Sequence, residues 1–399
     1  MAPSSRIRAG AWRGAAALSL VLICAACDTG TAPSQAIAAR TAQPASAAPS
    51  ATTATSTQSR SSTAISSEAS PFHVASCPPP EKPPSGIDTG PDVTITKPVA
   101  LRPMEAFSTD GPQGLAVVAG SVWTANESLD TVTRIDAASG EVTSIKVDPG
   151  IGPQWVVEAA GAVWSAGAGG LVRIDVESNS VDQRVSGCVG SIVSAFGSLW
   201  GGVPGGLIRV DPRTFAVAEV HPDTGAGLKC KVSAAADSVW LSCGAELSRI
   251  DPSSNSVRST VTTNGPYATV IAADGAAWVV TGLDPFSVQS REDAFATLER
   301  FDLETNDVVP STRMRLVHGA FAGGRLVDGN VIWLSTSFGV EPGAGKLFAF
   351  EPTSGKVLAA YDISEGKGYG SNAIAFGYGS LWTASGSANA VRRFLRPSP

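Results

Sequence analysis

Few residues of this chain have the types and spacing that chemistry requires. Three histidines are present, His73, His221 and His318, and we expect only His318 to lie beside a binding cavity. Beyond residue 27 the sequence contains no Cys-x-x-Cys, His-Glu-x-x-His, phosphate-cradling glycine loop or Gly-x-Ser-x-Gly. We therefore predict no metal site and no cofactor, and His318 is the one candidate catalytic residue.

The elements that must position these residues come from a repeat. A short apolar run ends in a two-residue turn, and a tryptophan follows three places later. The tryptophans are Trp123, Trp164, Trp200, Trp240, Trp278, Trp333 and Trp382. Strand-rich runs around such turns are hairpins, and a strand repeat of about 40 residues is typical of a β-propeller. We expect an all-β, seven-bladed propeller in which the tryptophans pack between neighbouring blades.

A second feature of the repeat is an acid at the end of the third strand, as in Arg134-Ile135-Asp136. The acids are Asp136, Asp175, Asp211, Asp251, Asp302 and Glu351. Turn residues follow them, and Asp accepts hydrogen bonds from backbone amides two residues on. We interpret these acids as turn caps and not as a metal-binding ring.

The last repeat lacks a fourth strand because the chain ends. The segment 92–107 directly precedes the first repeat and contains strand-like runs at 93–95 and 99–101. We expect it to supply the outer strand of the seventh blade, where Pro103 is tolerable because an outermost strand has one free edge.

The N-terminus has the features of an export signal. Three arginines precede an apolar run at 15–23, and Ala25 and Ala26 precede Cys27. This stretch resembles the bacterial lipobox, which implies a signal peptide at 1–26 and acylation of Cys27. The alternative is an ordinary secretory signal cut nearby. We expect the protein to be lipid-anchored at the cell membrane, on its extracytoplasmic side.

Residues 27–91 form a linker between this anchor and the propeller, which we place at 92–399. The linker is rich in Ala, Ser, Thr and Pro, so it cannot bury enough apolar surface to fold and is expected to be disordered. The formal net charge of the whole chain is −6, which disfavours nucleic acid or an anionic lipid surface as a partner.

Four cysteines remain beyond the signal, and an exported protein can oxidise them. The turn of the fourth repeat places Cys230 directly opposite Cys243 at a non-hydrogen-bonded pair, where the Cα separation suits a disulfide. We predict a Cys230–Cys243 bond and, from the remaining two, a possible Cys77–Cys188 bond. Free buried thiols or a Cys188–Cys230 bond remain open.

Loop lengths indicate where a ligand could bind. The spacing from the Trp to the third-strand acid is 11 to 13 residues in repeats one to four, 24 in repeat five and 18 in repeat six. The added residues lie at 283–297 and 337–346, on the face where the innermost strands begin. Binding residues tend to occupy such loops, although plain surface elaboration is an equal alternative. The candidate ligand-binding residues are Phe286, Arg291, Glu292, Asp293, His318, Glu341, Trp155, Tyr267, Tyr369 and Asn372.

The repeat resembles a known superfamily. Gly-Pro-Gln-Gly-Leu-Ala at 111–116, continuing to Arg-Ile-Asp at 134–136, is similar to repeats of the streptogramin (virginiamycin B) lyase-like and YVTN-type seven-bladed propellers, and the resemblance covers 92–398. In the lyase, a Mg²⁺-assisted elimination opens a cyclic depsipeptide, and His318-Gly319 resembles its His-Gly stretch. The carboxylate that follows the repeated Trp in the lyase is absent here, since Thr124-Ala125 follows Trp123.

These observations favour a binding module over an enzyme. We expect a monomeric lipoprotein that binds an unidentified small molecule, glycan or protein and contacts the membrane only through its lipid. The alternative is a lyase-like enzyme that uses His318 as base and Mg²⁺ as cofactor. A sensor or assembly subunit is a third possibility.

Overall fold

A computed structural model describes residues 77, 90–91, 98–220, 230–266, 268–282, 295–318, 320–339, 345–365 and 370–399. Within these ranges, the side chains of residues 282, 295, 317–318, 320–322 and 338–339 are not described. The chain divides into units Met1–Ile65 and Ser66–Pro399, and every described residue belongs to the second. None of the helices found in these ranges has the length and apolarity that a membrane span requires.

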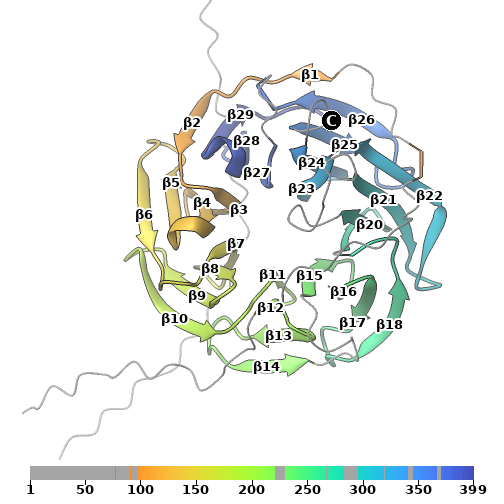
Figure 1. Ribbon diagram of the computed structural model, residues 1–399, viewed down its shortest axis with the longest axis horizontal. Helices are drawn as coiled ribbons and strands as arrows, with labels where there is room; N and C mark the ends of the chain where they lie inside the picture. The colour runs from red at the N-terminus through yellow and green to blue at the C-terminus, as the bar shows by residue number, and fades with distance from the viewer. Residues whose placement is uncertain are drawn as a thin grey trace, which may run out of the picture. The chain divides into compact units, whose positions relative to one another are not determined.

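The described part of the chain forms seven sheets arranged as a ring of blades, so the predicted seven-bladed propeller is confirmed (Figure 1). The innermost strands are β3 (Pro112–Val118), β7 (Pro153–Ala159), β11 (Ser191–Ala195), β15 (Cys230–Ala235), β19 (Thr269–Ala273), β23 (Ala320–Asp328) and β27 (Ala373–Gly377). The second strands are β4 (Ser121–Asn126), β8 (Ala162–Gly167), β12 (Ser198–Val203), β16 (Ser238–Cys243), β20 (Ala276–Gly282), β24 (Val331–Gly339) and β28 (Ser380–Ser385).

The outer half of each blade follows the same order. The third strands are β5 (Thr131–Asp136), β9 (Gly170–Asp175), β13 (Gly206–Val210), β17 (Glu246–Ile250), β21 (Phe295–Asp302), β25 (Lys346–Phe350) and β29 (Ala390–Leu395). The outer strands are β6 (Val142–Lys146), β10 (Ser180–Ser186), β14 (Val217–Val220), β18 (Val257–Thr262), β22 (Asp307–His318), β26 (Val357–Asp362) and, in blade seven, β2 (Glu105–Ser108). Strand β1 (Val99–Ala100) and the 3-10 helices η1 (Glu127–Leu129) and η3 (Gly386–Ala388) complete the elements.

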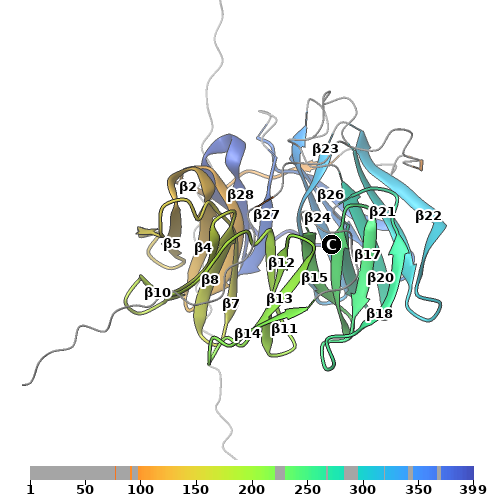
Figure 2. The same ribbon diagram turned by 60° about the horizontal axis from the view of Figure 1, so that its bottom comes forward.

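The ring has two distinct faces. We call the face with the turns between first and second strands the turn face, and the opposite one, where the innermost strands begin, the loop face. Figure 2 shows β22 and β23 of blades five and six extending toward the loop face, at the top of the view. The two insertions noted in the sequence, 283–297 and 337–346, belong to these same blades.

The first-to-second-strand turns have the backbone geometry that the sequence indicates. In five of them both residues have positive φ, as at Ala119 (47°) and Gly120 (78°), which matches the twist of a tight hairpin. Two of these turns place an aromatic residue at such an angle, Phe196 and Tyr378, each with φ 51°. A bulky side chain there is strained, and both are more than 40% exposed on the turn face.

The repeated tryptophans pack between neighbouring blades, as predicted. All seven are at most 2% exposed. Trp164 of blade two stacks on Phe215 of blade three with ring centroids 5.8 Å apart, and Trp240 of blade four meets Phe301 of blade five edge-on at 4.8 Å. Each indole therefore seals one blade against the next.

The third-strand acids cap turns, as predicted. Asp136 Oδ1 accepts hydrogen bonds from the backbone amides of Ala138 and Ser139 at 3.0 and 2.7 Å. The same pattern recurs at Asp175, Asp211, Asp251 and Asp302, and in reduced form at Glu351. The Ser139 amide, above all, holds the pKa of Asp136 below its ordinary value, because the bond favours the ionised carboxylate.

These caps give the stability a pH dependence of defined sign. A carboxylate whose pKa is lowered in the folded state stabilises the fold above its unfolded pKa of about 4, and this contribution disappears as pH falls through the folded pKa. We expect the urea midpoint of unfolding to fall between about pH 5 and pH 3. In the triple variant Asp136→Asn, Asp175→Asn, Asp211→Asn, the midpoint should fall less over this range. An equal loss in both proteins would contradict this assignment of the carboxylates.

A bond between blades was not predicted from the sequence. The arginine that faces the Trp across the second and third strands reaches into the next blade. Arg209, whose guanidinium lies 4.9 Å from the Trp200 ring, donates to the Pro252 carbonyl at 2.9 Å and to Asn255 Oδ1 at 3.0 Å. Arg134 and Arg249 make the equivalent bonds to the following blade. These arginines therefore join blades that the chain connects only by loops.

Blade two offers a matched control for this bond. Arg173 occupies the same strand position but pairs with Asp182 of its own blade, and Phe215 of blade three replaces the accepting Asn. We expect Arg209→Met to lower the free energy of unfolding by about 1.5 to 3 kcal/mol and Arg173→Met by less than about 1 kcal/mol. Urea titration of both variants measures the difference; equal losses would argue against blade-to-blade bonding as the cause.

The N-terminal segment closes the ring, but not with the residues that the sequence suggested. Strand β2 pairs antiparallel with β29 and completes blade seven, which confirms closure by an N-terminal strand. The run 99–101 was expected in the same strand, and this is wrong: Val99–Ala100 instead pairs in parallel with β26 of blade six. Pro103 separates the two runs and cannot donate to a ladder, so the chain moves from one blade to the next there. The run 93–95 lies outside the described residues.

Both predicted disulfides are present. Cys230 faces Cys243 in the β15–β16 register, with Cα atoms 4.3 Å apart. Cys77 is bonded to Cys188 across a sequence separation of 111 residues. The bond attaches Cys77 to the loop between blades two and three.

Candidate functional site

A concave site lies where the innermost strands meet around the ring. A cavity of about 530 Å³ is bounded by the first strands of blades two to six. Most of its lining side chains are apolar, and among the described lining residues the polar side chains belong to Ser233, Thr269 and Arg325. It extends from Trp155, near the start of β7, to Phe196 and Ala236 in turns on the turn face. Pockets of this size and lining commonly take small molecules.

Arg325 is the exceptional residue of this wall. In each repeat, one innermost-strand residue lies eight places before the Trp and directly precedes the Trp's cross-strand partner. The other six residues at this position are Leu115, Val156, Ile192, Val232, Val270 and Ile374. Five of those six are buried, so the ring position is one that the fold fills with aliphatic side chains. Blade six places a guanidinium there.

Trp155 also lines the cavity. Among the described residues it is the sequence candidate that does so, and its ring packs partly buried against the cluster between blades two and three. Its indole Nε1–H is buried and has no hydrogen-bond partner among the described residues. The indole N–H groups of Trp123 and Trp333, which do not line the cavity, are buried and unpaired in the same way, so this N–H does not by itself mark a ligand contact.

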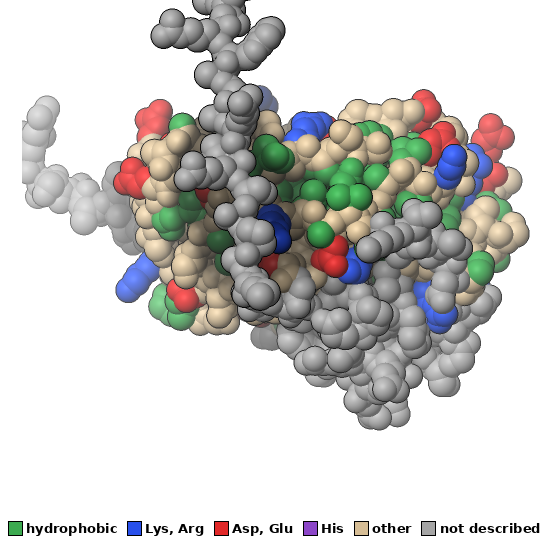
Figure 3. Space-filling model, turned by 90° about the horizontal axis from the view of Figure 1, so that it is seen from above, with side chains coloured by type: hydrophobic (Ala, Val, Ile, Leu, Met, Phe, Trp, Pro, Cys, Tyr) green, Lys and Arg blue, Asp and Glu red, His purple; other side chains and the backbone are tan. Residues whose placement is uncertain are grey.

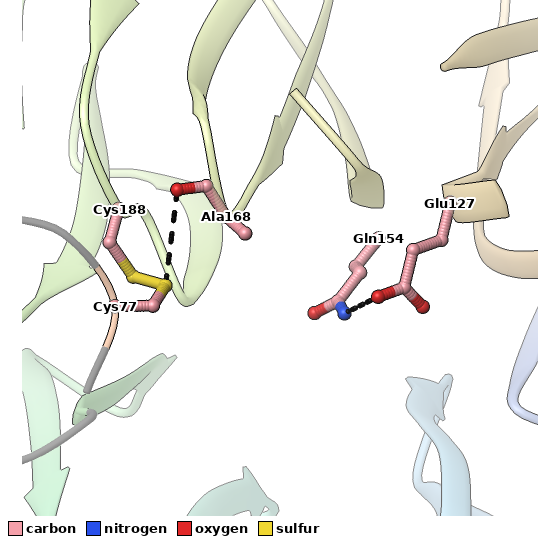
Figure 4. Close-up of a disulfide and its surroundings, with 5 residues drawn as sticks. All are labelled: Cys77, Glu127, Gln154, Ala168 and Cys188. Atoms are coloured by element: carbon pink, nitrogen blue, oxygen red, sulfur yellow. Dashed lines mark hydrogen bonds between the residues drawn. A yellow bond between two sulfur atoms is a disulfide. The ribbon is translucent and has the colours of Figure 1, made fainter. Parts of the chain in front are cut away.

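The loop face, where the sequence placed the site, shows polar groups that satisfy one another. Gln154 Nε2 donates to Glu127 Oε1 at 2.6 Å, joining blades two and one (Figure 4). Asn372 Nδ2 donates to Gln113 Oε1 at 2.6 Å, joining blades seven and one. The sequence candidate Asn372 is thus engaged in a contact between blades.

The Cys77–Cys188 disulfide lies on the same face, within 4.0 Å of the Ala168 carbonyl oxygen (Figure 4). The bond brings the segment before the propeller to the loop connecting blades two and three.

Most other sequence candidates lie outside the described residues. They are Phe286, Arg291, Glu292, Asp293, Glu341, Tyr267 and Tyr369. The backbone of His318 ends β22, where it pairs with Phe295, but its side chain is not described. A site built from the two insertions therefore remains a prediction. Within the described ranges no group of three or more His, Cys, Asp or Glu side chains could hold a metal ion.

A second cavity, of about 540 Å³, lies at the outer rim between β1 and the end of β26. Figure 3 views the rim that lies at the top of Figure 1 and shows hydrophobic side chains among charged ones. Val99 and Met104 are more than half exposed, and so is Leu395. The acids of this cavity are already paired, Asp362 with Lys346 and Glu365 with Arg392. The first cavity, which we call the channel cavity because the innermost strands around the centre of the ring bound it, is therefore the stronger candidate.

Comparison with known proteins identifies the fold but not the function. No family model and no curated protein matches the chain. Catalytically inactive virginiamycin B lyase from Staphylococcus aureus with quinupristin superimposes with a TM-score of 0.58 at 15% identity, over 73% of this chain and 99% of the lyase. The likeness shows a shared seven-bladed propeller.

Propellers of other functions are equally similar. A hydrazine synthase chain from Kuenenia stuttgartiensis gives a TM-score of 0.58 at 12% identity, over 74% of this chain and 98% of that one. The Myceliophteria thermophila Cps50 (Swd1) β-propeller domain gives 0.53 at 10% identity, over 74% and 100%. Because lyase, synthase and Swd1 domain share the architecture, a function for this chain must come from its own site.

Proposed function

We propose that this chain is an extracytoplasmic binding module whose propeller takes up a small ligand in its central channel. The observation that carries the proposal is the cavity of about 530 Å³, enclosed by the inner strands of five blades and lined by apolar side chains with a few polar groups. A rigid ring of blades holds these groups in fixed positions, so the ligand meets a preformed site.

The membrane anchor is the second part of the proposal. Arginines, an apolar run and Cys27 in sequence support export and acylation. The two disulfides fit an oxidising compartment. Metabolic labelling with an alkyne fatty acid should mark the wild type and not Cys27→Ala, and labelling of both would overturn the anchor.

The binding proposal is tested by filling the cavity. Ala234 of β15 lines it and is partly exposed, whereas Ala138 lies in an exposed turn between β5 and β6 of blade one and does not line it. We expect native purification followed by denaturation and mass spectrometry to release a small molecule from the wild type and from Ala138→Phe. Ala234→Phe should release none. Equal recovery from Ala234→Phe would place the ligand elsewhere, and a protein or glycan recovered instead would contradict a small-molecule role.

The lyase alternative is supported by the shared fold and by the resemblance of His318-Gly319 to the lyase's His-Gly stretch. The family's carboxylates, however, do not follow the repeated Trp. An assay for Mg²⁺-dependent ring opening of a cyclic depsipeptide, comparing the wild type with His318→Ala, discriminates the two functions. Activity lost in His318→Ala would replace the binding proposal with a catalytic one.

A further inference from the structure

The charge of Arg325 has no counter-ion within the part of the chain that the structure describes. No hydrogen bond or ion pair engages its guanidinium there. Of the strands that contact β23, four contain no charged residue, β19, β20, β24 and β27. The fifth, β21, carries Glu299, which is already paired with Arg313. Burial lowers the pKa of Arg325 to about 10, which leaves the group protonated at neutral pH. The channel wall therefore carries one uncompensated positive charge.

An uncompensated charge at this position is a cost that the fold avoids elsewhere. Six repeats fill the same ring position with Leu, Val or Ile. Replacing a desolvated charge by a well-packed aliphatic side chain is commonly neutral or stabilising. Folding alone therefore does not account for the arginine, whereas pairing with a bound anion does.

The polar groups of the cavity are complementary to an acceptor. Arg325 offers only donors. The Ser233 hydroxyl already accepts the Val270 amide at 3.2 Å, so it too has a donor to offer. No carboxylate belongs to the described lining. A ligand with negative charge or acceptor oxygens can pair with these groups.

The rest of the wall is complementary to an apolar body. Phe196 and Val327 flank the cavity at the turn face and are 43% and 40% exposed. Phe196 holds its aromatic ring there at a strained positive φ. Apolar groups of a ligand would cover these side chains while its charge reaches Arg325.

We propose that the channel cavity binds an organic anion, a compact apolar molecule with one carboxylate, sulfonate or phosphate group that pairs with Arg325. This inference rests on the proposed binding function and names its ligand class. A guanidinium holds such groups through two parallel hydrogen bonds, and a partly desolvated site strengthens the pairing. The lining favours a ligand with a large apolar part, because its apolar side chains would leave the polar groups of a strongly polar solute unpaired.

Two dyes with similar aromatic groups, one anionic and one neutral, distinguish the contribution of charge to binding from that of apolar contact. The anionic probe is 8-anilino-1-naphthalenesulfonate and the neutral probe is N-phenyl-1-naphthylamine, both followed by fluorescence titration. We expect Arg325→Ile to weaken binding of the anionic dye at least about tenfold and to change binding of the neutral dye less than about twofold. Arg325→Lys, which keeps the charge but loses the planar fork, should give an intermediate affinity for the anionic dye.

The same variant tests whether the arginine is structural. Arg325→Ile restores the residue type of the other six repeats, so its melting temperature should equal or exceed that of the wild type. A clearly lower melting temperature, or unchanged affinity for the anionic dye, would overturn the anion assignment. If the neutral dye still binds and Ala234→Phe abolishes its binding, the channel function stands while the anion inference fails. If neither dye binds the wild type, the channel proposal itself fails.

Discussion

A chain that begins at Asp110 is expected to melt about 5 to 10 °C below one that begins at Pro98. The two chains differ by β1 and β2, the strands that the N-terminal segment adds to blades six and seven. Without β2, the edge of β29 loses its backbone partners, and Trp382 loses Phe107, which stacks on it at 5.8 Å. The Glu105–Arg393 ion pair is lost as well.

Both truncated chains should carry Cys188→Ser, so that neither has an unpaired thiol in place of the Cys77–Cys188 bond. Differential scanning calorimetry then isolates the closing strands. The longer chain should unfold in one cooperative transition. The shorter chain should show a second, broader transition in addition, because blade seven frays before the rest of the ring unfolds. Coincident transitions at one temperature would mean that the ring closes without β2, for example through the C-terminal contacts of Arg396 with Asp328 and Phe376.

Replacing Trp240 by alanine is expected to lower the free energy of unfolding by about 3 to 5 kcal/mol. The side chain is 1% exposed, packs edge-on against Phe301 of the next blade and lies 5.5 Å beneath the Arg249 guanidinium. Its Nε1 donates to the Ala235 carbonyl at 3.1 Å. Alanine leaves a cavity between blades four and five and removes this hydrogen bond.

Trp240→Phe is the matched control, since it keeps most of the apolar contact and removes the N–H donor. We expect it to cost about 1 to 2 kcal/mol. Urea unfolding followed by far-ultraviolet circular dichroism gives both values. A loss below about 1 kcal/mol for Trp240→Ala would mean that the indole does not seal the blades, against the packing in the structure.

The sequence predicted the architecture well because its periodic features are local. A tight turn three residues before a Trp and an acid at the end of the third strand are short-range patterns. Each has the role predicted for it, as Trp240 and Asp136 show. The Cys230–Cys243 bond was predictable for the same reason, since register follows from the turn. Long-range strand pairing was harder to predict, because no local pattern indicates that Val99–Ala100 joins blade six and not blade seven.

The site was harder to predict than the fold. Attention to loop length selected the insertions of blades five and six, whereas Arg325 lies inside a strand. A comparison among the repeats would have identified it, because the residue eight places before the Trp is aliphatic in six repeats and Arg325 in the seventh. The Arg209 bridge was missed because its acceptor, Asn255, belongs to a different repeat.

The Cys77–Cys188 bond has a mechanical consequence. The closing strand β2 lies between these two cysteines in sequence, inside the covalent loop that the bond defines. Tension applied to the chain before residue 77 therefore passes through the disulfide into the loop between blades two and three. The hydrogen bonds of β1 and β2 carry none of that load and are not unzipped one by one from the end. A pull on the leading end of the protein is borne by a covalent bond, and the ring remains shut behind it.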